Sequence, residues 1–167
     1  MDAELASLSE RIGKALRERS LTLATAESCT GGWAAEVVTH TSGSSEWFER
    51  GFVTYSNEAK IEMLGVRPAT LAAHGAVSRE VAREMAAGAL KNSKALISLA
   101  ITGIAGPTGG SPDKPVGTVC FACCRKGEAP VAETRHYEGD RENIRKLSVI
   151  HALETVLSLI AAARTVP

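Results

Sequence analysis

Residues able to carry chemistry gather in three short polar segments of the chain, each after an apolar run. They read ESCTGG at 27–32, TYSNEAK at 54–60 and TGIAGPTGG at 102–110. Each follows an expected β-strand, and ligands of open α/β sheets bind where the carboxyl ends of strands meet. The sequence therefore predicts a site where these three segments converge.

The first segment offers two candidate nucleophiles, Ser28 and Cys29. Ser28 or Thr30 is also a suitable N-cap for the helix expected to follow. Gly31 and Gly32 are unusual there, because glycine in a first helical turn costs stability. They indicate backbone that approaches a ligand, with N–H groups facing an anion or a developing oxyanion. Ser28 is then a nucleophile, with Cys29 as its rival because a helix N-terminus lowers a thiol pKa.

A serine hydroxyl is a weak nucleophile until a base takes its proton, and no histidine lies near these segments. Tyr55 and Lys60 are the alternatives. Ser56 and Lys60 are four residues apart on one helix face, so Lys60 can reach back toward the strand end and the Tyr55 hydroxyl. Lysine is a base only if its pKa is lowered; otherwise Lys60 is an ordinary exposed lysine. Glu27 either orients a neighbour or places a favourable charge near the helix start.

The third segment resembles an anion-binding nest at 102–106, with glycines free to aim N–H groups inward. It is not a GxxxxGK[ST] phosphate loop, since no Lys-Ser/Thr follows the glycines. Arg141 and Arg145 lie one turn apart on the last expected helix and can reach a phosphate from one face. The alternative is a solvated face in which they pair with Asp140 or Glu142.

The elements that must position these residues alternate between helix and strand. Leu5, Leu8, Ile12 and Leu16 have helical spacing, so the first twenty residues predict an amphipathic helix. Strands are expected at 21–26, 47–55, 95–102, 118–124 and 131–137. Helices are expected at 30–40, after an N-cap at Ser56 or Asn57, after Pro68, from Ser78 to Leu90, and after Asp140 with an apolar stripe at Ile144, Leu147, Ile150, Leu153, Leu157 and Ile160.

This order predicts a single domain over 1–167, a three-layer α/β/α sandwich with a mixed, mostly parallel sheet of about five or six strands. Lys and Arg total 19, as do Asp and Glu, so no overall field attracts nucleic acid or an anionic membrane. The first twenty residues lack a signal-peptide core, and no apolar run is long enough for a membrane span. We therefore expect a cytoplasmic protein.

Cysteine and histidine positions give no support for a metal site or cofactor. Cys120 and Cys123 form a CxxC, but on a strand their side chains point to opposite faces. With Cys29 and Cys124 they are expected to be small buried hydrophobes in a reducing compartment. The four histidines have no ligand spacing. No metal and no cofactor are expected.

Five motifs together resemble the CinA C-terminal domain family, named after a competence-damage-inducible protein. They are TAESCTGG, WFERGFVTYSNEAK, HGAVS, ITGIAGPTGGSPDKPVGTV and GDR, and they extend over nearly the whole chain. The stand-alone nicotinamide mononucleotide deamidases of the family are especially similar. The resemblance implies a metal-independent amidohydrolase that converts nicotinamide mononucleotide and water to nicotinate mononucleotide and ammonia in pyridine nucleotide salvage. It also suggests a homodimer.

The resemblance implies roles for individual residues. Ser28 would be the nucleophile, Tyr55 and Lys60 would supply the base, and Thr102 with its neighbouring backbone would hold the amide or the tetrahedral intermediate. N–H groups near Thr30 to Gly32 would stabilise the oxyanion. The expected substrate-binding residues are Glu27, Thr30, Gly31, Gly32, Asn57, Gly103, Ala105, Gly106, Arg141 and Arg145, with the 103–106 loop and the arginines at the phosphate.

Two other functions stay open. The chain can be a non-catalytic module that binds or senses pyridine nucleotides, which would tolerate Ser28→Ala, whereas hydrolysis would stop. It can also be a cysteine hydrolase that uses Cys29.

Overall fold

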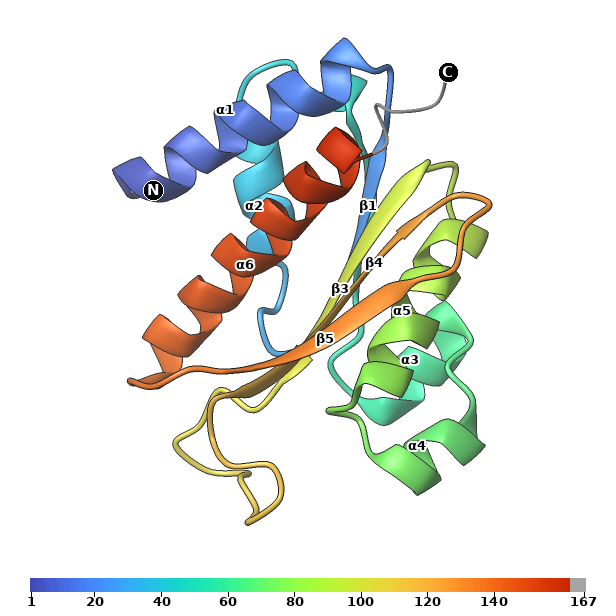
Figure 1. The fold of residues 1–167 in the computed structure, drawn as a ribbon, viewed down its shortest axis with the longest axis vertical. Helices are drawn as coiled ribbons and strands as arrows, with labels where there is room; N and C mark the ends of the chain where they lie inside the picture. The colour runs from blue at the N-terminus through green and yellow to red at the C-terminus, as the bar shows by residue number, and fades with distance from the viewer. Residues whose placement is uncertain (163–167) are drawn as a thin grey trace.

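The computed structural model describes residues 1–162, which form a β-sheet between two layers of helices (Figure 1). In chain order the elements are α1 (Ala3–Glu18), β1 (Leu23–Glu27), α2 (Trp33–His40), the 3₁₀ turn η1 (Ser44–Glu46), β2 (Phe48–Val53), α3 (Asn57–Leu64), α4 (Pro68–His74), α5 (Arg79–Lys91), β3 (Ile97–Gly103), β4 (Thr118–Arg125), β5 (Val131–His136) and α6 (Arg141–Ala162).

The sheet has five strands in the order β2-β1-β3-β4-β5. β1 pairs in parallel with β2 and β3, whereas β4 is antiparallel to both β3 and β5. Only β4 therefore runs against the other described strands. The predicted three-layer sandwich with a mixed, mostly parallel sheet is confirmed.

Each face of the sheet has its own apolar core. α1, α2 and α6 cover one face, and α5 with α3 and α4 covers the other (Figure 1). Leu5, Leu8, Ile12 and Leu16 are the buried face of α1, as the sequence predicts. β3 is buried between both layers, which explains its nearly continuous apolar sequence.

The buried stripe of α6 differs from the predicted one. Its buried apolar residues include Val149 and Val156, which the spacing did not single out, together with Ile144, Leu153 and Ile160. Leu147, Ile150 and Leu157 are only partly buried at its edges. The helix packs against both α1 and the sheet, so its contact surface is wider than one stripe.

Parallel pairing brings the carboxyl ends of β1, β2 and β3 side by side at one end of the strands, at the bottom of Figure 1. The three polar segments follow these ends. Arg141, the first residue of α6, lies at this end as well, because its side chain contacts Gly106 and Tyr55. This is where a ligand site is expected in an open sheet.

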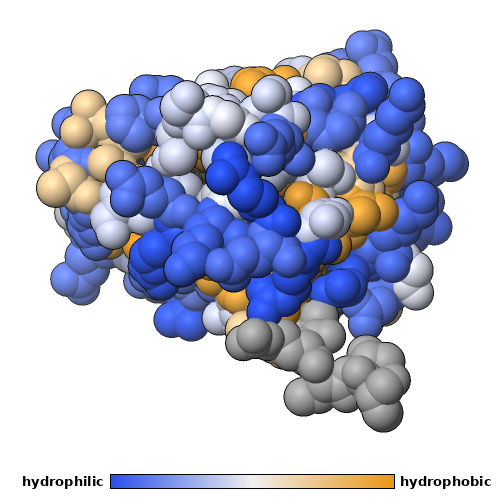
Figure 2. Space-filling view, turned by 90° about the horizontal axis from the view of Figure 1, so that it is seen from above, coloured by the Kyte–Doolittle hydropathy of each residue, from blue (hydrophilic) through white to orange (hydrophobic). Residues whose placement is uncertain are grey.

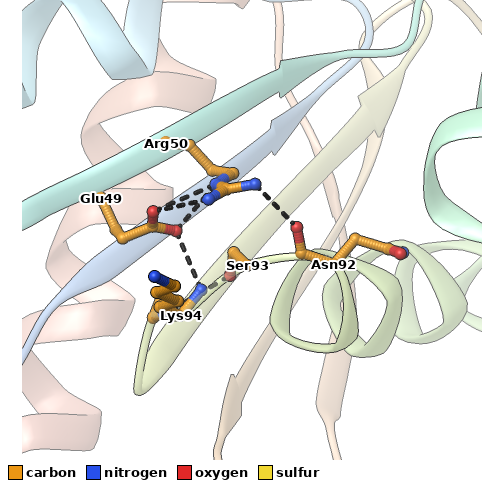
Figure 3. Close-up of polar contacts among 6 residues, drawn as sticks. Glu49, Arg50, Asn92, Ser93 and Lys94 are labelled. Atoms are coloured by element: carbon orange, nitrogen blue, oxygen red, sulfur yellow. Dashed lines mark hydrogen bonds and ion pairs between the residues drawn. The ribbon is translucent and has the colours of Figure 1, made fainter.

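The opposite end of the molecule is mostly hydrophilic (Figure 2). Here the Glu49 carboxylate accepts hydrogen bonds from the Arg50 side chain and from the Lys94 backbone, while Arg50 donates to the Asn92 carbonyl (Figure 3). These contacts hold the start of edge strand β2 against the α5–β3 turn.

Among residues 1–162, every helix is too short or too polar to cross a bilayer.

Candidate active site

A cavity of about 270 Å³ opens where the three polar segments meet. Its lining comes from five parts of the chain: Ser28 and Cys29, Tyr55 to Lys60, Ala76 and Val77, Thr102 to Gly109, and Arg141. The predicted convergence of the three strand ends is therefore observed. Asn57 lines the cavity as expected, from the first turn of α3.

Ser28 and Lys60 form the central pair of this cavity. The Lys60 Nζ lies 3.0 Å from the Ser28 Oγ, 2.9 Å from the Thr54 carbonyl oxygen and 3.4 Å from that of Tyr55. Ser56 caps α3 by accepting from the Ala59 N–H, which fixes the helix that carries Lys60. Lys60 is only 1% exposed and Ser28 only 8%. The pair is held by α3 and by the segment that follows β1, and both side chains are nearly buried.

The surroundings of Lys60 make its charged form less favourable than that of an exposed lysine. Burial lowers the pKa of the Lys60 ammonium, because the charged form loses its hydration. Its two carbonyl neighbours can accept the two hydrogens of a neutral amine. The nitrogen lone pair is then left for the Ser28 hydroxyl, which is the arrangement that a general base requires.

Cys29 is a poor nucleophile in this structure. The residue borders the cavity, but its thiol is buried, and burial raises the pKa of the thiol to about 12. The predicted lowering of the pKa by the helix N-terminus is wrong here, because desolvation of the thiolate is the largest effect. Of the two candidates, only Ser28 has a base within hydrogen-bond distance.

The turn after β1 explains its two glycines. α2 begins at Trp33 with Gly32 as its N-cap, so the expectation that Ser28 or Thr30 caps the helix is wrong. Gly31 and Gly32 have φ of 59° and 107°, a left-handed conformation that glycine adopts without strain. The glycines thus form the sharp turn between Ser28 and the helix.

Glu27 lies outside the cavity, although the sequence placed it among the substrate-binding residues. Its side chain is on the opposite face of β1 from Ser28 and is 1% exposed. Its carboxylate accepts from the Thr30 hydroxyl at 2.7 Å and from the N–H groups of Ala34 and Ala35 at 2.8 and 3.1 Å. All these partners belong to the turn and to α2.

Thr102 lines the cavity with its hydroxyl committed as a donor. The Thr102 Oγ1 donates to the Ala76 carbonyl at 2.9 Å. Since a hydroxyl has a single hydrogen, Thr102 can present only lone pairs to a ligand. Thr102 is therefore suited to accept from an amide NH₂ group, and it cannot donate to an oxyanion at the same time.

The predicted oxyanion donors near Thr30 to Gly32 do not face the Ser28 cavity. The Gly31 N–H donates to the Ser28 carbonyl, and Thr30 and Gly32 line a neighbouring pocket. The loop after β3 offers other donors. Within residues 1–162 the N–H groups of Ala105 and Gly106 have no hydrogen-bond partner, and both residues line the Ser28 cavity.

Tyr55 and Arg141 meet at the mouth of the cavity. Arg141 donates to the Tyr55 hydroxyl at 3.1 Å and to the Gly106 carbonyl at 2.8 Å. Tyr55 is 61% exposed. The expectation that Lys60 reaches the Tyr55 hydroxyl is wrong, because Lys60 contacts the Tyr55 backbone carbonyl instead.

Arg145 lies in the neighbouring pocket, of about 690 Å³, which also includes Gly31 and Gly32 and shares Arg141 with the Ser28 cavity. Its guanidinium donates to the carbonyls of Cys29 and Thr30 at 3.0 and 3.2 Å and stacks over the Trp33 ring at 5.5 Å. Arg145 therefore holds the turn that follows Ser28 from outside.

Ala76 and Val77, between α4 and α5, line the cavity although the sequence reasoning gave them no role. They belong to the HGAVS motif, but a backbone carbonyl that accepts a hydrogen bond from the Thr102 hydroxyl cannot be recognised from residue type.

Among residues 1–162, no group of three or more His, Cys, Asp or Glu side chains could hold a metal ion. The free cysteines are all buried.

Comparison with known proteins identifies the family of this site. The family model of the CinA C-terminal domain matches residues 5–160. The chain belongs to the CinA C-terminal domain family. The resemblance inferred from the motifs is confirmed.

Relatives within the CinA family are of two lengths. The chain is 55% identical over 155 residues to the nicotinamide-nucleotide amidohydrolase PncC of Escherichia coli strain K12, covering 93% of this chain and 94% of that protein. It is 48% identical to a CinA-like protein of Geobacter sp. strain M21, covering 96% of this chain but 38% of that protein. The same domain thus occurs within longer chains.

Solved structures of CinA proteins share the fold. The competence/damage inducible protein CihA from Agrobacterium tumefaciens superposes with a TM-score of 0.92 at 44% identity, covering 95% of this chain and 97% of that one. A CinA superfamily protein from Escherichia coli has a TM-score of 0.89 at 38% identity, covering 95% and 92%.

Proposed function

We propose that this protein is a nicotinamide-nucleotide amidohydrolase that converts nicotinamide mononucleotide and water to nicotinate mononucleotide and ammonia. The observation that carries the proposal is the buried Ser28–Lys60 pair, with Nζ 3.0 Å from Oγ inside a cavity at the strand ends. The high identity to the Escherichia coli amidohydrolase over almost the whole chain supports the substrate. The protein is a hydrolase of a carboxamide C–N bond.

The first half of the reaction uses Ser28 as nucleophile. Neutral Lys60 takes the hydroxyl proton as the Ser28 Oγ attacks the carboxamide carbon. The resulting tetrahedral intermediate places a negative charge on the former amide oxygen. The unpaired N–H groups of Ala105 and Gly106 are the donors that we assign to this oxyanion.

The second half releases both products. Protonated Lys60 delivers its proton to the leaving nitrogen, so the C–N bond breaks and ammonia departs. The acyl group remains bound to Ser28 as an ester. Lys60 then takes a proton from water, which attacks the ester, and returns it to Ser28 as nicotinate mononucleotide leaves. The reaction consumes only water, and Ser28 with Lys60 supplies the nucleophile and the base, so we propose that it needs no metal and no cofactor.

The substrate has two ends to be recognised. Thr102 Oγ1 lone pairs accept from the carboxamide NH₂ group. Arg141, which borders both pockets, holds the phosphate, since the Ala105 and Gly106 N–H groups serve the oxyanion at the other end of the substrate, and Arg145 lies beside Trp33 in the neighbouring pocket. The positively charged pyridinium ring near Lys60 further disfavours its protonation.

We also propose that the chain acts as a single domain, works in the cytoplasm in pyridine nucleotide salvage, and forms a homodimer that does not bind nucleic acid. The equal numbers of acidic and basic residues support the last point. Light scattering of the purified chain, with and without a duplex oligonucleotide, tests both. A monomer, or a complex with the duplex, would contradict these two statements.

The function is tested by measuring ammonia and nicotinate mononucleotide after the chain is incubated with nicotinamide mononucleotide and a metal chelator. We expect equal amounts of both products. Nicotinamide riboside, which lacks the phosphate, should react far more slowly. Binding of the nucleotide without ammonia release would instead establish a non-catalytic binding module.

A further inference from the structure

Glu27 and Ser28 are consecutive residues whose side chains lie on opposite faces of the sheet. Ser28 faces the Lys60 side, whereas the Glu27 carboxylate is enclosed on the α2 side. Glu27 lines neither the Ser28 cavity nor the pocket beside it. Its carboxylate therefore acts on the protein itself rather than on a ligand.

The Glu27 carboxylate does the work of an N-cap for α2. Gly32 occupies the N-cap position and has no side chain to accept from the first N–H groups of the helix. Glu27 accepts from the Ala34 and Ala35 N–H groups instead. These are the donors that a capping serine or aspartate satisfies.

The same carboxylate also fixes the turn between the nucleophile and the helix. Its Oε1 accepts from the Thr30 hydroxyl, two residues after Ser28. Arg145 holds the carbonyls of Cys29 and Thr30 from the other side. The Ser28 N–H is bonded to the Ile101 carbonyl on β3. The backbone around Ser28 is thus tied on three sides.

We propose that Glu27 is a positioning residue for Ser28: by joining the end of β1 to Thr30 and to the start of α2, it keeps the Ser28 Oγ at the Lys60 Nζ. This inference rests on the proposed amidohydrolase function. A displacement of about 1 Å at a reacting group can lower a rate about a hundredfold. Loss of the Glu27 contacts therefore lowers kcat more than it changes KM.

The chain contains a matched control in Glu84. Its carboxylate accepts from the Arg67 N–H and the Thr70 hydroxyl, and so ties down the start of α4, whose N-cap residue Arg67 makes no side-chain capping bond of its own. Glu84 does not line the Ser28 cavity. Glu27→Gln and Glu84→Gln are thus the same chemical change at two helix starts, of which only one adjoins the nucleophile.

The experiment compares kcat, KM and thermal unfolding of the two variants with the wild-type chain, at a temperature where all are folded. For Glu27→Gln we expect kcat to fall about 10- to 100-fold with KM within about twofold. For Glu84→Gln we expect both constants to stay within about twofold. Equal kcat in the two variants, despite a lower unfolding temperature for Glu27→Gln, would overturn the positioning role.

A gentler variant covers the case in which Glu27→Gln does not fold. Thr30→Val keeps the side-chain shape and removes one of the three donors to Glu27, and its side chain is fully buried, although the residue borders the pocket beside the Ser28 cavity. We expect kcat to fall about three- to tenfold at unchanged KM. An unchanged kcat would contradict the inference. If the wild-type chain itself releases no ammonia, the proposed function fails instead.

Discussion

The turn after β1 and the loop after β3 meet at one cavity but differ in how some of their polar groups are held. In the 28–32 turn the Ser28 N–H, the Cys29 and Thr30 carbonyls and the Thr30 hydroxyl are all bonded within the protein. In the loop after β3, the N–H groups of Ala105 and Gly106 lack a partner among the described residues.

This difference separates two tasks of an enzyme. A nucleophile must be fixed before the substrate arrives, and the bonds of the Ser28 N–H, the Thr30 hydroxyl and the Cys29 and Thr30 carbonyls hold the turn that carries the proposed one. Donors for a developing oxyanion must be unoccupied until the transition state forms. In the proposed mechanism the turn after β1 serves to position Ser28, and the loop after β3 serves to recognise the substrate.

The largest loss of activity is expected from Lys60→Met, which removes one member of the Ser28–Lys60 pair. The variant keeps an apolar side chain of similar length but removes the base, so we expect turnover to fall about 10²- to 10⁴-fold. Initial rates of ammonia release give the measurement. Lys91→Met, an exposed lysine on α5, is the control and should retain wild-type turnover.

The next largest loss of activity is expected from Thr102→Val, a change at the end of β3. Thr102→Val removes the lone pairs offered to the amide, and we expect kcat/KM to fall about 10- to 100-fold. Thr25→Val is the matched control, because the Thr25 hydroxyl is buried in β1 without a partner among the described residues. Equal activity of the two variants would remove Thr102 from the site.

The pH dependence of kcat/KM tests the role proposed for Lys60. In the proposed mechanism the base is neutral Lys60, so kcat/KM should rise about tenfold per pH unit below its pKa and level off above it. Because burial lowers the Lys60 pKa, the plateau should begin below the ordinary value for lysine of about 10.4. A rate that falls as the pH rises would contradict a lysine base.

The smallest effect is expected from Tyr55→Phe. Lys60 contacts the backbone carbonyl of Tyr55, which the substitution keeps, and only the bond from Arg141 to the hydroxyl is lost. We expect KM to rise about two- to fivefold with little change in kcat. A loss of kcat by orders of magnitude would show that the hydroxyl takes part in proton transfer.

Local patterns predicted which residues meet, but not how they are bonded. The i, i+4 spacing of Ser56 and Lys60 and the shared edge of parallel strands were enough to bring Ser28 beside Lys60. Glu27 was assigned to a ligand because it adjoins the glycine turn, and Arg145 because it shares a helix face with Arg141. Their internal partners, such as the Ala34 N–H and the Cys29 carbonyl, are backbone groups without a residue-type signal.

The layers of the fold followed from hydrophobic spacing, and the errors came from tertiary contacts. The start of α2 was placed too early, because the sequence does not reveal that Glu27 caps the helix from the preceding strand. Val149 and Val156 were missed on α6, since its contact surface depends on how the helix lies between α1 and the sheet.

The central claim, that Ser28 is the nucleophile, is tested most directly by ammonia release from nicotinamide mononucleotide in Ser28→Ala and Cys29→Ala, with nucleotide binding measured for each. We predict that Ser28→Ala binds the nucleotide without turnover, while Cys29→Ala keeps turnover within about twofold, because its buried thiol has a pKa of about 12. Turnover by Ser28→Ala, or its loss in a folded Cys29→Ala, would contradict the account.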